Sequence, residues 1–283
     1  MSFRKRLLIL FLGLLVAGVL DALFAPFLIA HGVRWWIEWT ARRQGSRAEI
    51  ERVEAPFLRP VTIRNLSLGP GKKDGHAISL HAATIVVDLN LRGWIFRKDA
   101  SLLRSVRVDS LTGSIRVPQT SAAARLDWRP FGRLLPGKFQ LTDLNLDVST
   151  STTTVTLRGV MLTASAIESG RFFAREIYVS APLLRQTFRG LRGATSWESS
   201  RLTIAGIPLA RGLDLEALTL DLSRLAKRRV GVDLQLDTYG GTLRASFQGR
   251  GGKKFSIDLA GSAANISLAQ ISRAFGFLEP VTG

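Results

Sequence analysis

The 283-residue sequence predicts a mainly β protein. An N-terminal transmembrane helix is followed by an extended, curved antiparallel β-sheet shaped as a groove, with a few short helices. Two observations predict the sheet. Apolar and polar residues alternate in many segments, which places their side chains on opposite faces of a strand. Helical spacing of apolar residues is rare between these segments, so few helices are expected to cover the sheet.

The alternation is interrupted in a regular way. In Phe139–Val148, apolar residues alternate, slip by one position at Thr142–Asp143 and then alternate again. A bulged residue produces this slip, returns the apolar side chains to the same face and bends the strand. Four further segments begin or complete the same pattern: Val61–Leu68, Val106–Leu111, Val155–Leu162 and Leu213–Leu222.

Residues 1–30 predict a short tail and a membrane anchor. Arg4, Lys5 and Arg6 precede an apolar run from Leu7 to Ala30 that only Asp21 interrupts. About 20 apolar residues suffice to cross a bilayer as a helix. A cleaved signal peptide is the alternative, but no small-x-small cleavage site accompanies the run. The basic tail predicts that the N-terminus stays in the cytoplasm.

Residues 31–45 predict a juxtamembrane helix with three closely spaced tryptophans. Helical spacing places Trp35 and Trp39 on one face, with Trp36 beside them. Tryptophans next to a membrane span are typical of an interfacial aromatic belt. The alternative is that this helix caps the strand domain and its tryptophans are core residues.

Residues 46–283 predict a single β-rich domain. Strands are expected beyond the five slipped segments at Ile78–Leu91, Ile177–Val179, Leu202–Ile204, Val230–Leu236, Leu243–Phe247 and Phe255–Leu259. Glycine-rich turns join the last three as a meander. Leu268, Ile271 and Phe275 have helical spacing and predict a short helix over Ile266–Phe275. The ending Pro280–Gly283 resembles the opening of another strand, which is typical of a domain that continues.

The composition favours an anionic partner. The formal net charge is +17 at pH 7, and the chain has no cysteine, which excludes a disulfide scaffold and thiol catalysis. Nucleic acid is not the expected partner, because the basic residues are scattered singly along strands without a basic helix, zinc-finger spacing or aromatic ribonucleoprotein motif. An anionic lipid surface fits this pattern better.

Catalytic motifs are scarce, so we expect no enzymatic activity, no cofactor and no metal site. His76 and His81 lie five apart in an alternating segment, on opposite faces, and neither a nucleophile elbow nor a phosphate loop occurs. The acids occupy polar strand positions, as on a solvated sheet face: Asp143, Asp147, Asp214, Asp221, Asp233 and Asp237.

The apolar face of the sheet is the candidate functional surface. Such a face is buried by closure into a sandwich or barrel, or it is left open to an apolar ligand. The open alternative predicts a groove for acyl chains. Its candidate residues are Ile63, Leu66, Leu68, Ile85, Val87, Leu89, Leu141, Leu144, Leu146, Leu215, Leu218 and Leu220.

The order of segments resembles a known family. The apolar run leads to Ser46–Val53, then Pro60–Leu68, Ile78–Leu91, Leu102–Val108 and Gly113–Val117, and the chain ends with Ala264–Ile271 and Pro280–Gly283. This order is similar to the AsmA-like proteins of the bacterial envelope, including the TamB and YhdP types. The resemblance covers nearly the whole chain, but it consists of weak positions and transfers no catalytic residue.

The resemblance implies a bacterial inner-membrane protein that crosses once, with most of the chain in the periplasm. It implies a lipid-binding or lipid-transfer role in outer-membrane or envelope biogenesis, with phospholipids or other anionic envelope lipids and the inner membrane as partners. The alternative is a structural assembly factor that binds an envelope or outer-membrane protein and carries no lipid.

Overall fold

The fold is described from a computed structural model of the chain. It describes residues 26–43, 45–56, 59–70, 77–90, 102–116, 135–182, 184–227, 229–250 and 256–267. Within these ranges the protein is mainly β, as the sequence predicts, with one open sheet of 13 strands and a single α-helix.

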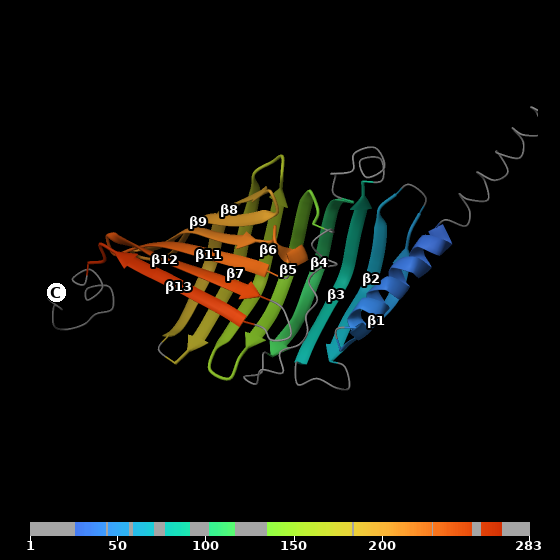
Figure 1. Ribbon diagram of the computed structural model, residues 1–283, viewed down its shortest axis with the longest axis horizontal. Helices are drawn as coiled ribbons and strands as arrows, with labels where there is room; N and C mark the ends of the chain where they lie inside the picture. The colour runs from blue at the N-terminus through green and yellow to red at the C-terminus, as the bar shows by residue number, and fades with distance from the viewer. Residues whose placement is uncertain are drawn as a thin grey trace, which may run out of the picture.

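The strands follow one another in the sheet in chain order, from β1 to β13 (Figure 1). Their bounds are β1 Ser46–Glu54, β2 Val61–Pro70, β3 Ala77–Leu89, β4 Leu103–Arg116, β5 Lys138–Ser149, β6 Thr154–Ser165, β7 Gly170–Ala181, β8 Leu184–Glu198, β9 Arg201–Ala210, β10 Leu213–Asp221, β11 Arg229–Thr238, β12 Gly241–Arg250 and β13 Ser256–Ala264. A short 3-10 turn, η2 Leu225–Lys227, precedes β11.

One pairing departs from the predicted antiparallel sheet. Strands β4 and β5 are parallel, with Val108 opposite Leu141 and Leu111 opposite Leu144. All other neighbouring strands pair antiparallel. Parallel neighbours need a crossover instead of a tight turn, and the long segment between Arg116 and Lys138 provides the necessary length.

The predicted slips form a line of irregularities across the sheet. Along this line, at the same level from β1 to β10, residues are left out of the cross-strand pairing. Between β1 and β2, for example, Ile50 pairs with Leu66 and Arg52 with Arg64, so the residue between them on each strand is left out, and the pairing of β5 with β6 is interrupted on both sides of Leu144. Residues on this line adopt the left-handed backbone conformation that bulges use: Asn65, Ser110, Gly159, Gly190 and Gly206. Register shifts confirm the predicted bulges around Leu144 between β5 and β6 and after Leu215 on β10. At Asn65 and Ser110, the ladders skip a residue on both strands and keep their register.

The sheet changes direction between β8 and β9. Strands β9–β13 run at a steep angle to β1–β8 and cross in front of β5–β8 (Figure 1). A cluster of buried residues from β6–β10 lies where the sheet changes direction: Val160, Ala174, Leu191, Ile207 and Leu215. Gly193 permits the close approach at the corner, because a Cβ there would lie 2.6 Å from Ile207 Cγ1 and 2.7 Å from the Ala205 carbonyl oxygen.

Every predicted strand has a counterpart, but two of the strand predictions fall short. β7 extends well beyond the predicted Ile177–Val179, and β8 was not predicted at all. Alternation is not visible in β8, because Gln186, Gly193 and Thr195 occupy positions at which an alternating strand would carry apolar residues. The missed strand is therefore the one at which the sheet folds.

The structure contradicts the predicted single-pass inner-membrane localisation. Among the residues described, no helix is long and apolar enough to cross a membrane. The helix over residues 26–43 carries Arg34, Glu38, Arg42 and Arg43 in 18 residues. Most of the predicted span, Leu7–Ala30, falls on residues 1–25 and lies outside the described residues, as does most of the predicted helix Ile266–Phe275.

The helix packs beside β1 at the start of the sheet (Figure 1). Thr40 and Ala41 are buried, and Val33 and Ile37 are half-buried, so these side chains form one face at helical spacing. Ile50 of β1 is buried as well. The N-terminal end of the sheet is thus covered by the helix.

Candidate functional site

One face of the sheet is apolar from end to end, and we call it the inner face. The strand registers define it, because side chains of directly paired residues lie on the same face. Its central row consists of Ile50, Leu66, Ala82, Leu111, Leu144, Val160, Ala174 and Leu191. These eight residues, one from each of β1–β8, connect in a single line of cross-strand pairs.

All twelve groove candidates predicted from the sequence lie on the inner face. Ile63, Ile85 and Leu141 belong to the neighbouring row through their pairings with Val53, Val108 and Leu162. Leu68 and Leu146 belong to the row on the other side, and Val87 and Leu89 alternate with Ile85. Leu215, Leu218 and Leu220 pair with Ile207, Ile204 and Leu202 in the folded-over part.

Coverage of the inner face varies along the sheet. From β6 to β9, at least one inner residue of every strand is buried, and Ala174 has no exposed surface. From β3 to β5, only Ala82 and Leu141 are buried, and the inner residues of β4 are half-buried. At the far end, Phe247 and its cross-strand partner Leu259 are 37% and 67% exposed. The inner face is therefore buried most completely in β6–β9, less so in β3–β5, and is exposed at Phe247 and Leu259.

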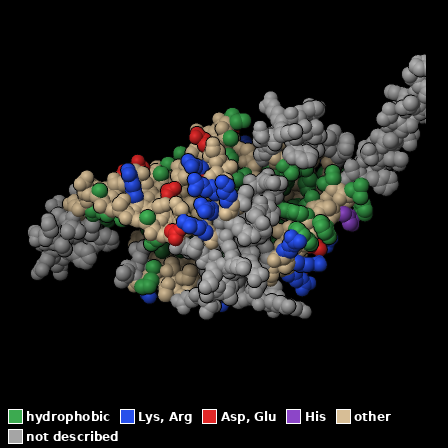
Figure 2. Space-filling model, in the orientation of Figure 1, with side chains coloured by type: hydrophobic (Ala, Val, Ile, Leu, Met, Phe, Trp, Pro, Cys, Tyr) green, Lys and Arg blue, Asp and Glu red, His purple; other side chains and the backbone are tan. Residues whose placement is uncertain are grey.

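The opposite, outer face is polar and paired. The guanidinium of Arg158 donates to the carboxylate of Asp147 at 2.7 Å and 2.9 Å, and Arg189 donates to Glu176 at 3.1 Å. Over the crossing strands β9–β13, charged and other polar side chains predominate (Figure 2). This face is the solvated one, which explains the acids on the polar strand positions.

Three outer carboxylates have a lowered pKa. The Thr142 hydroxyl, which donates to Asp109 at 2.7 Å, is the main cause of the lowered pKa of Asp109. The Arg158 hydrogen bonds lower the pKa of Asp147, and the Ser223 hydroxyl lowers that of Asp221. Each of these groups stabilises a charged carboxylate, so none is poised to exchange a proton near neutral pH.

The three predicted interface tryptophans lie on the helix, and two of them face solvent. Trp35 is 64% exposed and stacks on Trp39 with ring centroids 5.8 Å apart. The Arg43 guanidinium lies 3.7 Å from the Trp39 ring centroid, and Phe27 continues the stripe through its contact with His31. Trp36 is half-buried. The helix thus covers the sheet with one face and presents aromatic side chains on another.

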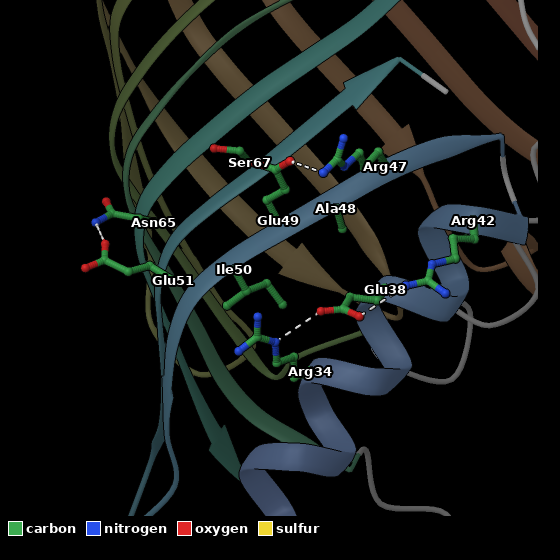
Figure 3. Close-up of a pocket in the computed structure, with 10 residues that line it drawn as sticks. All are labelled: Arg34, Glu38, Arg42, Arg47, Ala48, Glu49, Ile50, Glu51, Asn65 and Ser67. Carbon is green, nitrogen blue, oxygen red and sulfur yellow. Dashed lines mark hydrogen bonds and ion pairs between the residues drawn. The ribbon is translucent and has the colours of Figure 1, made fainter. Parts of the chain in front are cut away.

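A cleft between the helix and β1 does not suit an acyl chain. Figure 3 shows that charged side chains dominate its lining, with Glu38 bridging Arg34 and Arg42 from the helix and Glu51 accepting from Asn65. Ile50 and Ala48 are its apolar contributors. The opposing charges neutralise one another, so the cleft is also a poor anion site.

The predicted absence of catalysis and metal binding stays a prediction. The His81 ring nitrogen Nδ1 lies 3.0 Å from the Ser67 hydroxyl on the outer face, and His76 is outside the described residues. In the part of the chain that the structure describes, no group of three metal-ligating side chains comes together.

Sequence reasoning missed two features of the candidate surface. One is the exposed pair Phe247–Leu259 beside β13, the last strand of the sheet within the described residues. The alternation in the sequence gave no indication that this pair is uncovered. The other is an incomplete pairing of β8 with β9: five residues of β8, Ala194–Glu198, pair with Arg201–Ala205. In the sequence, the glycines Gly190, Gly193 and Gly206 were the feature that could have indicated this incomplete pairing.

No model of a known protein family matches the chain, and no similar protein is found among the curated proteins.

Proposed function

We propose that this protein binds lipids non-covalently, with their acyl chains held against the inner face where it is open over β3–β5. The observation that carries the proposal is that apolar inner residues in the middle of the sheet, among them Ile85, Val108 and Leu111, are only half-buried. Soluble proteins rarely leave large contiguous apolar surfaces without a ligand or partner.

The energetics favour an acyl chain as the ligand. Each methylene removed from water contributes about 0.8 kcal/mol. The aligned rows offer apolar contacts from strand to strand at intervals of about 4.8 Å, without a polar residue between them. A hydrocarbon chain lying across the strands loses no hydrogen bonds on binding, because the backbone groups below it are already paired within the sheet.

The helix supplies a second reason to propose lipid. Its exposed stripe of Phe27, Trp35 and Trp39 next to Arg34 and Arg43 is typical of side chains at a lipid surface. We propose that this stripe contacts the bilayer from which lipid is taken or to which it is delivered. Replacing Trp35 and Trp39 by alanine should reduce binding to vesicles that contain phosphatidylglycerol, and replacing the half-buried Trp36 should reduce it less.

The proposal extends to a role like that of the AsmA-like proteins. The resemblance in segment order and the apolar inner face of the sheet both favour phospholipid transfer during envelope biogenesis. No covalent chemistry is needed, because shielding acyl chains from water is sufficient to move a lipid between surfaces.

Photo-crosslinking of the full chain tests lipid binding. Benzoylphenylalanine is placed at Ile85, on the inner face of β3, or at the adjacent Thr84, on the outer face, and the protein is mixed with phospholipid vesicles. We expect mass spectrometry to find lipid adducts at position 85 at least about ten times more often than at position 84. Equal yields at both positions, or none at 85 in a folded protein, would exclude the inner face as the lipid site.

A structural assembly factor is the second candidate, and it is favoured by β13, which has no further strand beside it among the residues that the structure describes. Leu259 is 67% exposed there, and an edge strand offers unpaired backbone groups to an incoming strand of a protein partner. The two candidates differ in the state of the inner face. A cysteine at position 85 that resists thiol reagents in a folded, lipid-free protein would indicate a closed face and favour the assembly factor.

A further inference from the structure

The sheet splits between β8 and β9. Residues 184–193 of β8 pair only with β7, and residues 206–210 of β9 pair only with β10, while the two strands pair with each other at Ala194–Glu198 and Arg201–Ala205. We call the region between these two unpaired halves the β8–β9 split. It lies where the sheet changes direction, at the edge of the buried cluster.

Burial decreases along the split, from its closed end outward. Leu191 and Ile207, nearest the paired end, are 4% and 2% exposed. Phe188 and Leu209 are half-buried and pack against the same apolar cluster. Gln186 occupies an inner-face position opposite Val179 and is exposed. The apolar packing therefore ends between Phe188 and Gln186, and the outer end of β8 contacts solvent.

The two half-strands are poorly suited to pair with each other or with an added strand. Gly190 and Gly206 have φ values of 63° and 69°, which interrupt a regular ladder on each side. Pro208 has no backbone N–H to donate. Arg185 and Arg189 place charge on the β8 side, and bulges, prolines and charged side chains are the features that protect strand edges from strand addition. The occupant expected here is one that needs no backbone hydrogen bonds.

The outer rim of the split is strongly basic. Between Gly170 and Thr195, the sequence contains five arginines and a single acidic residue, Glu176. Arg189 is paired with Glu176 at 3.1 Å. Arg192 lies 5.9 Å from the Phe173 ring centroid, and among the residues that the structure describes, neither Arg185 nor Arg192 makes an ion pair. Guanidinium groups bind phosphate oxygens with two parallel hydrogen bonds.

We propose that the β8–β9 split is a lateral opening through which phospholipids with anionic headgroups reach the inner face. The acyl chains pass between Phe188 and Leu209, and the phosphate stays outside, at Arg185 near the open end of the split or at Arg192 near its closed end. This inference rests on the proposed lipid binding and adds the route and the headgroup preference. The apolar side chains lie on the inside of the split and the arginines on the outside, in the arrangement that a phospholipid requires.

A steric block tests the route. The chain has no cysteine, so a single cysteine at Gln186 can be modified specifically with a large polyethylene glycol maleimide. The matched control carries the same polymer at Thr112, an exposed outer position of β4. With vesicles that contain a fluorescent phosphatidylglycerol, we expect the block at 186 to slow lipid uptake by at least about tenfold, and the block at 112 to leave it unchanged.

A charge reversal tests the headgroup preference. Arg185→Glu combined with Arg192→Glu is compared with Arg116→Glu combined with Arg244→Glu, two exposed arginines elsewhere that give the same net charge. At about 1 kcal/mol per arginine, the first pair should reduce the preference for phosphatidylglycerol over phosphatidylcholine by about tenfold or more. The second pair should leave it within about twofold of the unmodified protein.

The outcomes separate this inference from the function on which it rests. If both polymer-modified proteins take up lipid at the same rate, lipid binding stands and the lateral opening is wrong. If the two charge-reversed proteins keep the same preference, the arginine headgroup site is wrong. If the unmodified chain takes up no lipid, the proposed function fails and the inference fails with it. If benzoylphenylalanine at Gln186 captures polypeptide and no lipid, the split is a protein-docking edge.

Discussion

Two regions of the inner face, β3–β5 and β6–β9, have the same sequence pattern but different environments. Both carry aliphatic residues that alternate in every strand except β8, and the line of bulges crosses both. In β6–β9, the face is buried around Ala174 and Leu191, whereas Val108 and Leu111 of β4 stay half-exposed. The difference shows that alternation determines which side of a strand is apolar, while the covering of that side depends on where the sheet folds.

The closed region is built by the corner at β8. Gly193 allows Ile207 and the backbone of β9 to approach β8, and Gly170 sits against the Thr163 carbonyl group and the Thr195 hydroxyl, where any side chain would clash. No such corner occurs between β3 and β5, which are long strands paired along most of their length. The region over β3–β5 therefore lacks the cover that the corner gives to β6–β9.

The largest difference is expected from one leucine deletion in each region. Leu191 and Leu111 belong to the same row of cross-strand pairs. Leu191→Ala should lower the free energy of unfolding by about 2–5 kcal/mol, because it leaves a cavity in a packed cluster. Leu111→Ala should cost less, about 1–2 kcal/mol, because Leu111 is only half-buried and part of its side chain already contacts water. Chemical denaturation measures both values, and equal costs would contradict the comparison.

A smaller effect is expected at the corner glycine. Gly193→Ala places a Cβ against Ile207 and the Ala205 carbonyl oxygen, and overpacking of this kind costs about 1–3 kcal/mol. Gly69→Ala is the control, because its Cβ would meet nothing within 4 Å. Thermal unfolding should show a lower midpoint for the first variant and little change for the second. An unchanged midpoint for Gly193→Ala would mean that β9 does not pack closely on β8.

The smallest effect is expected on the outer face, where Asp147 of β5 meets Arg158 of β6. The lowered pKa of Asp147 means that the folded state binds the proton more weakly than the unfolded state, so the pair stabilises the fold above the ordinary pKa of 3.8. Both side chains are more than a third exposed, at 43% and 34%, so Asp147→Asn should cost less than about 1 kcal/mol at pH 7.

The pH dependence identifies the cause of that effect. The stabilisation is lost as pH falls below the ordinary pKa of 3.8 and through the lowered pKa, so the difference in stability between the native protein and Asp147→Asn should shrink progressively below pH 3.8. Asp237→Asn is the control, since Asp237 is exposed and makes no ion pair within the described part of the chain. A stability difference for Asp147→Asn that persists unchanged in acid would rule out the charge as its source.

The sequence by itself determined the strands, their apolar face and the bulges. These are local properties: the period of two residues sets the face, and the slip at Thr142–Asp143 or Arg158–Gly159 shifts it by one residue. All twelve residues predicted for the groove therefore lie on one face. The strand β8 escaped detection because Gln186, Gly193 and Thr195 break the period at the corner.

Only the tertiary structure decided the parallel pairing of β4 with β5, the fold at β8–β9 and the split beside it. Each depends on contacts between residues distant in sequence, such as Gly193 with Ile207 or Gly170 with Thr195, which no local pattern encodes. The exposure of the tryptophans also depended on tertiary packing. Helical spacing placed Trp35 and Trp39 on one face, but the packing of the helix beside β1 left that face exposed and covered its other side.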